Sequence, residues 1–282
     1  MPADPLSDFI EQQNTRIEEI LRRFGSYQPQ GVDRERIRIW LRQFQSEDFD
    51  LILRVLENVE FYDLARLHEL LRALHKAIRT QAHSDGFRNL ENLVFVPIGE
   101  TAESGQEIIR RYRNVNRTIN AKAKLAQVIE LPKLLYEADK TGEKLALVFL
   151  DDFIGTGKKV SDYWKQVLSH HIYPNRTMYV GTAVACNIGL RRVEDETPLH
   201  VIPVHIVRDR HLINETNQFT PAEKYRIRSY CDEVGNPPLG IGSLGVMVAF
   251  AHGCPNNTLS ILRGSKLQRH RRGILPRFED IP

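Results

Sequence analysis

The sequence predicts an α/β protein with a doubly wound, mainly parallel sheet and an N-terminal helical extension. Two observations carry this prediction. Residues 1–86 contain apolar side chains at helical spacing, whereas residues 87–282 contain apolar runs of strand length that alternate with amphipathic stretches. Such alternation is typical of parallel strands joined by crossover helices. We therefore expect an N-terminal helical domain over residues 1–86 and an α/β domain over residues 87–282.

Four stripes of apolar residues indicate the helices of the first domain. The first stripe begins behind Ser7, a candidate N-cap residue, and the last stripe is the longest. The stripes cover Phe9–Phe24, Ile37–Phe44, Leu51–Leu56 and Leu64–Ile78. They are most simply the faces that pack into a core, and a partner-binding groove is the alternative.

The second domain is predicted from five apolar runs of strand length. These runs are Asn92–Ile98, Leu145–Leu150, Thr177–Ala185, His200–Val207 and Val246–Ala251. One helix among them has a clear start, because Thr220 and Glu223 have the spacing of a capping box and Pro221 occupies the first helical position.

The composition is that of an ordinary globular chain. Of its 282 residues, 41% are hydrophobic and 27% are charged, and the formal net charge is +3. So small a charge does not by itself indicate nucleic-acid binding, and no apolar run approaches the ~20 residues that span a bilayer. The first residues lack a secretory pattern, and Cys186, Cys231 and Cys254 lack metal-binding spacing. We expect a cytoplasmic protein with reduced thiols, no protein-only metal site and no membrane partner.

The segment over residues 147–158 carries the clearest signal for function. A buried strand of four apolar residues is followed by two acids, and then by a short Gly-rich turn that leads into a helix. In an open parallel sheet, ligands bind beyond the carboxyl ends of the strands, where a helix N-terminus can hold a phosphate. Paired acids accept hydrogen bonds from vicinal hydroxyls, so the combination suits a sugar phosphate. The candidate residues are Asp151 and Asp152 for the sugar, and Gly155, Thr156, Gly157 and Lys158 for the phosphate.

Other interpretations of this segment account for less of it. A Walker A loop needs Gly at position 152 and Ser or Thr at position 159, where this chain has Asp152 and Lys159. A magnesium site of the receiver type explains the paired acids but does not require a Thr-Gly turn into a helix. A solvated turn without any ligand is the remaining alternative.

A second loop, over residues 99–105, follows the first predicted strand. Glycines bound it and an amphipathic helix follows, so its backbone N–H groups could hold a pyrophosphate leaving group. The candidate residues are Glu103, Ser104 and Gly105. Glu100 and Glu103 are unfavourable beside pyrophosphate unless Mg²⁺ lies between, and a plain connecting loop is the alternative.

Residues 147–157 resemble the phosphoribosyl diphosphate (PRPP) motif of the type I phosphoribosyltransferases: a hydrophobic strand, two acids, two apolar residues, a small residue and Thr-Gly. The resemblance implies a phosphoribosyltransferase-like fold, PRPP as substrate or ligand, and Mg²⁺ bound through the PRPP. It also implies that Asp151 and Asp152 orient the ribose hydroxyls and stabilise positive charge on the sugar during transfer. The family usually places Thr or Ser two positions after the glycine, where this chain has Lys159.

Four segments together resemble one subgroup of phosphoribosyltransferase-like proteins, which is found in bacterial anti-phage conflict systems. They are Trp40–Phe44, Pro97–Gly105, Asp151–Gly157 and Pro255–Leu259. The subgroup often continues with Pro and then Trp, where this chain has Ser260 and Ile261. This resemblance implies a defence effector or toxin-like protein, in some cases retron-associated, with a partner protein or nucleic acid of the same module. Relatives that use PRPP are commonly dimers, so a homo-oligomer is expected.

Three functional hypotheses follow. The chain is a phosphoribosyltransferase, a binding protein that senses a ribosyl phosphate or nucleotide without turnover, or an assembly subunit. The paired acids and Thr156 favour the first hypothesis, whereas Lys159 and the acidic loop favour the second. The third rests on the helical domain and on basic residues between Arg263 and Arg277, which are either a solvated face or a nucleic-acid contact.

Overall fold

The computed structural model describes residues 4–98, 104–117, 123–172, 176–235, 237–264 and 272–278. The chain divides into two compact units, one formed by Met1–Ala65 with Arg208–Pro282 and the other by Arg66–Val207. Neither boundary coincides with the division expected at residue 86. Within the described ranges, no helix combines the length and the hydrophobicity that crossing a bilayer requires.

The unit Arg66–Val207 contains a five-stranded sheet in which every neighbouring pair is parallel. The strands are β2 (Leu93–Pro97), β3 (Lys124–Leu125), β4 (Ala146–Ile154), β5 (Met178–Ala185) and β6 (His200–Ile206). Their order is β3-β2-β4-β5-β6, so the chain winds in one direction from β2 to β3 and in the other from β4 to β6. The predicted doubly wound α/β fold is confirmed.

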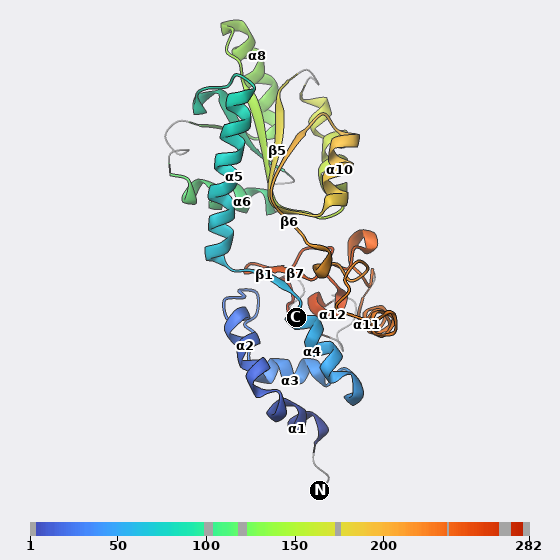
Figure 1. The fold of residues 1–282 in the computed structure, drawn as a ribbon. Helices are drawn as coiled ribbons and strands as arrows, with labels where there is room; N and C mark the ends of the chain where they lie inside the picture. Colours follow the sequence, from blue (N-terminus) through green and yellow to red (C-terminus); the bar gives the residue numbers. More distant parts are fainter. Residues whose placement is uncertain are drawn as a thin grey trace. The chain divides into compact units, whose positions relative to one another are not determined.

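Helices cover both faces of this sheet, and Figure 1 shows α5 and α10 on opposite sides of it. The helices are α5 (Leu64–Ser84), α6 (Ser104–Val115), α8 (Leu131–Thr141), α9 (Lys158–Gln166) and α10 (Asn187–Glu196). On one face, a Cβ added to Gly181 of β5 would lie 3.0 Å from Cδ1 of Ile78 in α5. On the other face, α8, α9 and α10 contribute Leu135, Trp164 and Val193 to one buried cluster with the strands. The first unit boundary therefore falls near the start of α5, because that helix packs on the sheet.

The motif strand is longer than expected. Leu145–Leu150 was the predicted range, but β4 continues to Ile154 because Asp151, Phe153 and Ile154 keep their pairing with β5. Both acids therefore stand on a strand rather than in the loop that follows. The two-residue strand β3 was not predicted.

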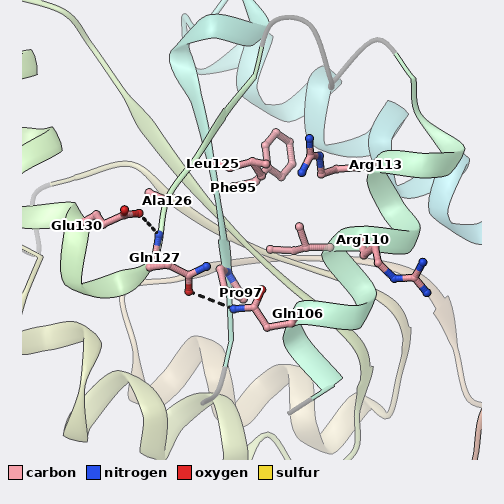
Figure 2. A pocket seen from close by; sticks show the side chains of 10 residues that line it. Phe95, Pro97, Gln106, Arg110, Arg113, Leu125, Ala126, Gln127 and Glu130 are labelled. Atoms are coloured by element: carbon pink, nitrogen blue, oxygen red, sulfur yellow. Dashed lines mark hydrogen bonds between the residues drawn. The ribbon is translucent and has the colours of Figure 1, made fainter. Parts of the chain in front are cut away.

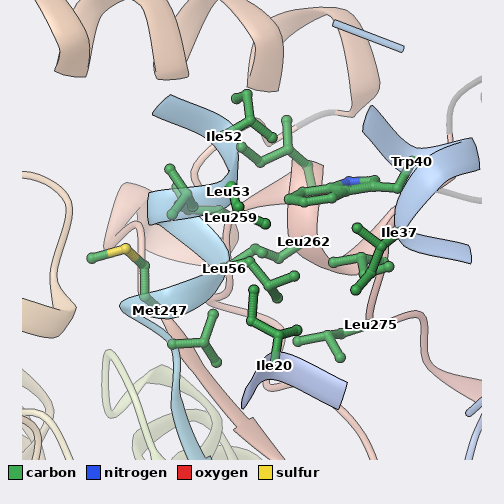
Figure 3. Close-up of a cluster of buried hydrophobic side chains, with 14 of the residues drawn as sticks. Ile20, Ile37, Trp40, Ile52, Leu53, Leu56, Met247, Leu259, Leu262 and Leu275 are labelled. Carbon is green, nitrogen blue, oxygen red and sulfur yellow. The ribbon is translucent and has the colours of Figure 1, made fainter. Parts of the chain in front are cut away.

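The other unit is mainly helical and includes a small parallel pair of strands, β1 (Glu60–Tyr62) with β7 (Val248–Phe250). Its helices are α1 (Pro5–Gln12), α2 (Asn14–Phe24), α3 (Arg34–Leu41), α4 (Phe49–Glu57), α11 (Pro221–Val234) and α12 (Ser260–Arg263). Residues far apart in sequence share its core, as Figure 3 shows for Trp40, Leu56, Met247 and Leu262.

Hydrogen bonds tie the C-terminal segment of the chain to the N-terminal helices. The Tyr27 hydroxyl donates to the carbonyls of Leu275 and Pro276, at 3.0 and 2.6 Å. The Trp40 indole N–H donates to the carbonyl of Ile261 at 2.9 Å. Leu275 is fully buried in the same core. For this reason the last quarter of the chain belongs with residues 1–65 and not with the large sheet.

Two predicted helix starts have different outcomes. The capping box at Thr220 is confirmed, because its side chain accepts from the N–H of Glu223 and the Glu223 side chain accepts from the N–H of Thr220. The N-cap expected at Ser7 is wrong. The first helix begins at Pro5, and the Asp4 carboxylate accepts the N–H of Leu6 instead. Asp and Ser are both favoured N-cap residues, but only Asp4 is followed by a proline, which is favoured at the first position of a helix.

Candidate functional site

The candidate site lies where the winding of the large sheet changes direction. Strands β2 and β4 are neighbours, but the chain leaves β2 toward β3 and leaves β4 toward β5. In sheets of this kind, ligands bind in the crevice beyond the carboxyl ends of the two central strands. The turn over residues 155–158 follows β4 directly at this point.

The predicted second loop follows β2, at the same edge of the sheet. Glu103 and the rest of residues 99–103 lie outside the described residues. Ser104 and Gly105 open helix α6, so their backbone stands at a helix N-terminus. The two candidate loops thus leave neighbouring strands whose last paired residues are Pro97 and Leu150.

Asp151 is almost completely buried, with 2% of its surface exposed. Its Oδ2 atom lies 3.6 Å from Nζ of Lys159, and its Oδ1 atom accepts the N–H of Asp152 at 3.1 Å. Burial raises the pKa of Asp151 to about 7, against the opposing effect of the Lys159 ammonium. A carboxyl group in this state titrates near neutrality rather than near pH 4.

Asp152 is half-buried and lies beside Asp151. Its charge and a side-chain hydrogen bond with Asp151 both contribute to the raised pKa of the Asp151 carboxyl. The structure thus brings the two predicted acids together as a pair. Two adjacent carboxyl groups of which one holds a proton can both donate and accept hydrogen bonds.

The Gly-rich turn is held against the start of α10. Gly157 has φ +73°, and a Cβ added there would lie 2.5 Å from the carbonyl oxygen of Gly189. A Cβ added to Gly189 would in turn lie 2.3 Å from the carbonyl oxygen of Gly155. The backbones touch, so glycine is required on both sides of the contact. The sequence did not single out Gly189, because nothing in its own neighbourhood marks this long-range contact.

The turn delivers the chain to the N-terminus of α9. Gly157 is the N-cap residue and offers no side-chain cap, so the first N–H groups of α9 keep their capacity to bind an anion. The Thr156 hydroxyl accepts the N–H of Lys158 at 3.4 Å. The Lys158 side chain pairs with Asp162 on the next turn. Of the predicted phosphate-binding residues, Gly155, Thr156 and Gly157 therefore offer backbone groups. The N–H of Lys158 is shared with the Thr156 hydroxyl, and its side chain is paired with Asp162.

A pocket of about 340 Å³ lies on the β3 side of strand β2 (Figure 2). Phe95 and Pro97 of β2 line it together with residues of α6. The amides of Gln106 and Gln127 are joined across it by a hydrogen bond of 3.1 Å. Half of the ten lining residues are polar or charged, including Arg110, Arg113 and Glu130, and the other half are apolar. A mixed lining of this kind can hold a flat, polar ligand group. Gln106 and Gln127 were not predicted, because nothing in the sequence around either residue marks it and only the fold brings them together.

Among the described residues, no group of three or more His, Cys, Asp and Glu side chains is placed to hold a metal ion. A paired Asp151 and Asp152 beside the Gly-rich turn is nevertheless a donor set that Mg²⁺ accepts when phosphate oxygens complete its shell.

Comparison with known proteins identifies one family. The family model described as PRTase-CE matches residues 37–277, which is most of the chain. No curated protein sequence matches. The match spans both compact units, so the helices from α3 onward and the C-terminal segment belong to the family's pattern along with the sheet.

Proposed function

Because the chain belongs to the PRTase-CE family, whose members are phosphoribosyltransferase-like, we propose that the site at Asp151 binds PRPP or a related ribosyl phosphate. One observation carries the proposal. The acid pair and the Gly-rich entry to α9 follow each other at the point where the sheet changes its winding direction. A ribose with a 5′-phosphate needs these two elements side by side.

Each element has a distinct task in the proposed complex. Asp151 and Asp152 would bind the 2′- and 3′-hydroxyls of the ribose. The backbone N–H groups over residues 155–158, with the Thr156 hydroxyl, would bind the 5′-phosphate. The backbone at Ser104 and Gly105, where α6 begins, would bind the pyrophosphate group. The pocket beside β2 would then be available to the base of a nucleotide.

In this proposal, Mg²⁺ would bind together with PRPP and mainly through its oxygens. When bound, it would neutralise pyrophosphate charge, with PRPP oxygens as most of its ligands and the acid pair as neighbours. The protein's own contribution would be to orient the ribose between the acid pair and the N-terminus of α9. This agrees with the lack of a third carboxylate or histidine beside the pair among the described residues.

The ion pair with Lys159 favours binding without turnover as a second candidate function. Ribosyl transfer builds positive charge on the sugar ring, and carboxylates stabilise that charge. An ammonium 3.6 Å from the Asp151 carboxylate cancels part of this stabilisation. Release of pyrophosphate from PRPP in the presence of a base panel separates the two functions, because a sensor binds PRPP but releases none.

Calorimetry with PRPP and Mg²⁺ tests the binding proposal. Asp151→Asn with Asp152→Asn replaces the acid pair by neutral amides, which are weaker acceptors for the ribose hydroxyls, so we expect a loss of about 3 kcal/mol, or roughly 100-fold in affinity. Glu194→Gln with Asp195→Asn on α10 is the matched control, because it removes the same charge from exposed positions. Equal, weak binding of PRPP to wild type and to the double Asp151 variant would rule the proposal out.

The biological setting of the proposal is an effector of a bacterial anti-phage system. The resemblance of four segments to the conflict-system subgroup supports it, together with the PRTase-CE match. The genomic neighbours of the gene test it. A reverse transcriptase or another defence gene beside it is expected, whereas purine or pyrimidine salvage genes would contradict it.

A further inference from the structure

Helix α5 has two faces of opposite character. One face is apolar and buried against the sheet, with Leu71, Leu74 and Ile78 completely buried. The other face is polar and carries positively charged and histidine side chains. Those residues are His68, Arg72, His75, Lys76, Arg79 and His83. With four Arg or Lys residues and one Glu, the helix has a formal net charge of +3, the same as the whole chain.

Three cations of this face have no ion-pair partner among the described residues. Arg72, Lys76 and Arg79 are exposed, and within the described part of the chain none of them has a carboxylate within 4.0 Å. Two arginines of α6 provide a contrast. On the neighbouring helix α6, Arg110 and Arg111 both pair with Glu107 at 2.7 Å. Glu69, three residues before Arg72, is the one carboxylate of α5, so the repulsion between the α5 cations is compensated only in part within the helix.

The same face is hollowed. A depression of about 450 Å³ is lined by His75, Lys76, Arg79, Thr80 and His83, and none of these residues is acidic. A second depression of about 450 Å³ adjoins it, lies between α5 and the edge strand β6, and shares Lys76 and Thr80. Lys76 thus stands on the ridge between two hollows with hydroxyl and imidazole groups around it.

We propose that this face of α5 binds the phosphodiester backbone of a double-stranded nucleic acid, without reading its sequence. The row from Arg72 to His83 spans eleven residues, or about 16 Å along the helix, which exceeds a single phosphate group. A row of unpaired cations on a helix is the electrostatic complement of a polyanion.

A duplex fits this face better than a single strand does. Proteins that hold single strands stack the bases on aromatic side chains, and the residues lining both depressions include no Phe, Tyr or Trp. A duplex keeps its bases stacked internally and offers only phosphates to such a surface. The aromatic rings among these lining residues are all imidazoles, and His75 is already engaged with the Tyr112 hydroxyl at 2.9 Å.

Fluorescence anisotropy with the full chain and a labelled 20-base-pair DNA duplex tests the proposal. With three contacting cations, the plot of log affinity against log salt should have a slope of about −3. The variant Arg72→Gln, Lys76→Gln, Arg79→Gln should bind at least about tenfold more weakly at low salt. The single variant Lys76→Gln should reduce the slope by about 1, which keeps the test independent of the triple variant's folding.

Two controls decide the interpretation. Lys133→Gln, Lys140→Gln, Lys144→Gln removes the same charge from exposed positions on and after α8, and it should bind the duplex as wild type does. A labelled 20-nucleotide single strand should bind more weakly than the duplex. No binding by wild type, equal losses in both triple variants, or preference for the single strand would each overturn the proposal. Calorimetry with PRPP should give the same result for wild type and the α5 variant, so failure here and failure of the ribosyl-phosphate site are distinguishable.

Discussion

Nζ of Lys159 lies 3.6 Å from Oδ2 of Asp151, so a lysine on the first turn of α9 neutralises the buried acid of β4. The related phosphoribosyltransferase motif has a hydroxyl residue at the position of Lys159. In this chain, the same position supplies the charge that keeps a desolvated carboxyl partly ionised. Lys159 is therefore both the residue that departs from the motif and the positive charge that acts on Asp151.

Lys159→Met should weaken PRPP binding at pH 7. Removal of the ammonium raises the pKa of Asp151 further, so the carboxyl is protonated at neutrality and accepts a ribose hydroxyl less well. We expect a loss of about tenfold at pH 7 that is largely recovered at pH 9, measured by calorimetry. Tighter binding by the Met variant at pH 7 would show instead that Lys159 competes with the ligand for Asp151.

The raised pKa of Asp151 predicts that stability falls as pH rises. The native state binds a proton at Asp151 more strongly than the unfolded chain does, so this stabilisation is complete below pH 3.8 and is lost as pH rises through about 7. Between pH 5 and pH 8, Asp151 should contribute a decrease of about 2 to 3 kcal/mol in the free energy of unfolding. Urea unfolding of wild type and of Asp151→Asn at several pH values measures it.

The comparison of these two proteins isolates Asp151, because His75 and every other titrating group is present in both. The difference between the two unfolding free energies should change steadily from pH 5 to pH 7 and then level off. A constant difference would mean that Asp151 keeps an ordinary pKa, and therefore that it is not desolvated.

Gly157→Ala should destabilise the sheet unit more than Gly142→Ala. The two glycines have nearly the same conformation, with φ of +73° and +72°. An added Cβ at Gly142 meets nothing within 4 Å, so that change costs only about 1 to 2 kcal/mol of backbone strain. At Gly157 the Cβ would lie 2.5 Å from the backbone of Gly189, which forces the turn away from α10. Urea midpoints report the difference, and PRPP affinity should fall only for Gly157→Ala. Equal midpoints would contradict the tight contact.

The elements that the sequence predicts correctly are those in which the spacing of apolar residues is visible over a short segment. Strands such as β5 and β6 begin and end within a residue or two of their apolar runs, because a buried parallel strand is continuously apolar. β1 was missed because three residues are too few to show a period. Its pairing of Phe61 with Ala249 joins segments almost two hundred residues apart. Pairing at that distance leaves no mark on either local sequence.

The residues of the candidate site also fall into those that local sequence predicts and those that depend on long-range contacts. Asp151, Asp152 and the turn at Gly157 are contiguous, so their shared role can be predicted from spacing alone. Gly189 and the Gln106–Gln127 amide pair come from separate elements, and only the winding of the sheet brings them to the site. The burial of Asp151 also depends on elements that follow it in the chain. From the sequence alone, only the residues of the continuous segment at 151–157 could be assigned to the site. The residues that other elements contribute could not.

Deletion of residues 272–282 should destabilise the helical unit and leave the sheet unit unchanged. The deleted segment includes Ile274 and Leu275, both fully buried, and the carbonyls that accept from Tyr27, so several kcal/mol of stability are expected to be lost. The two tryptophans report the units separately, since Trp40 lies in the helical unit and Trp164 in the sheet unit. Fluorescence in a Trp164→Phe background should show a lowered urea midpoint after the deletion, and fluorescence in a Trp40→Phe background should not. A lowered midpoint in the Trp40→Phe background alone would instead assign the C-terminal segment to the sheet unit, as a boundary at residue 86 requires.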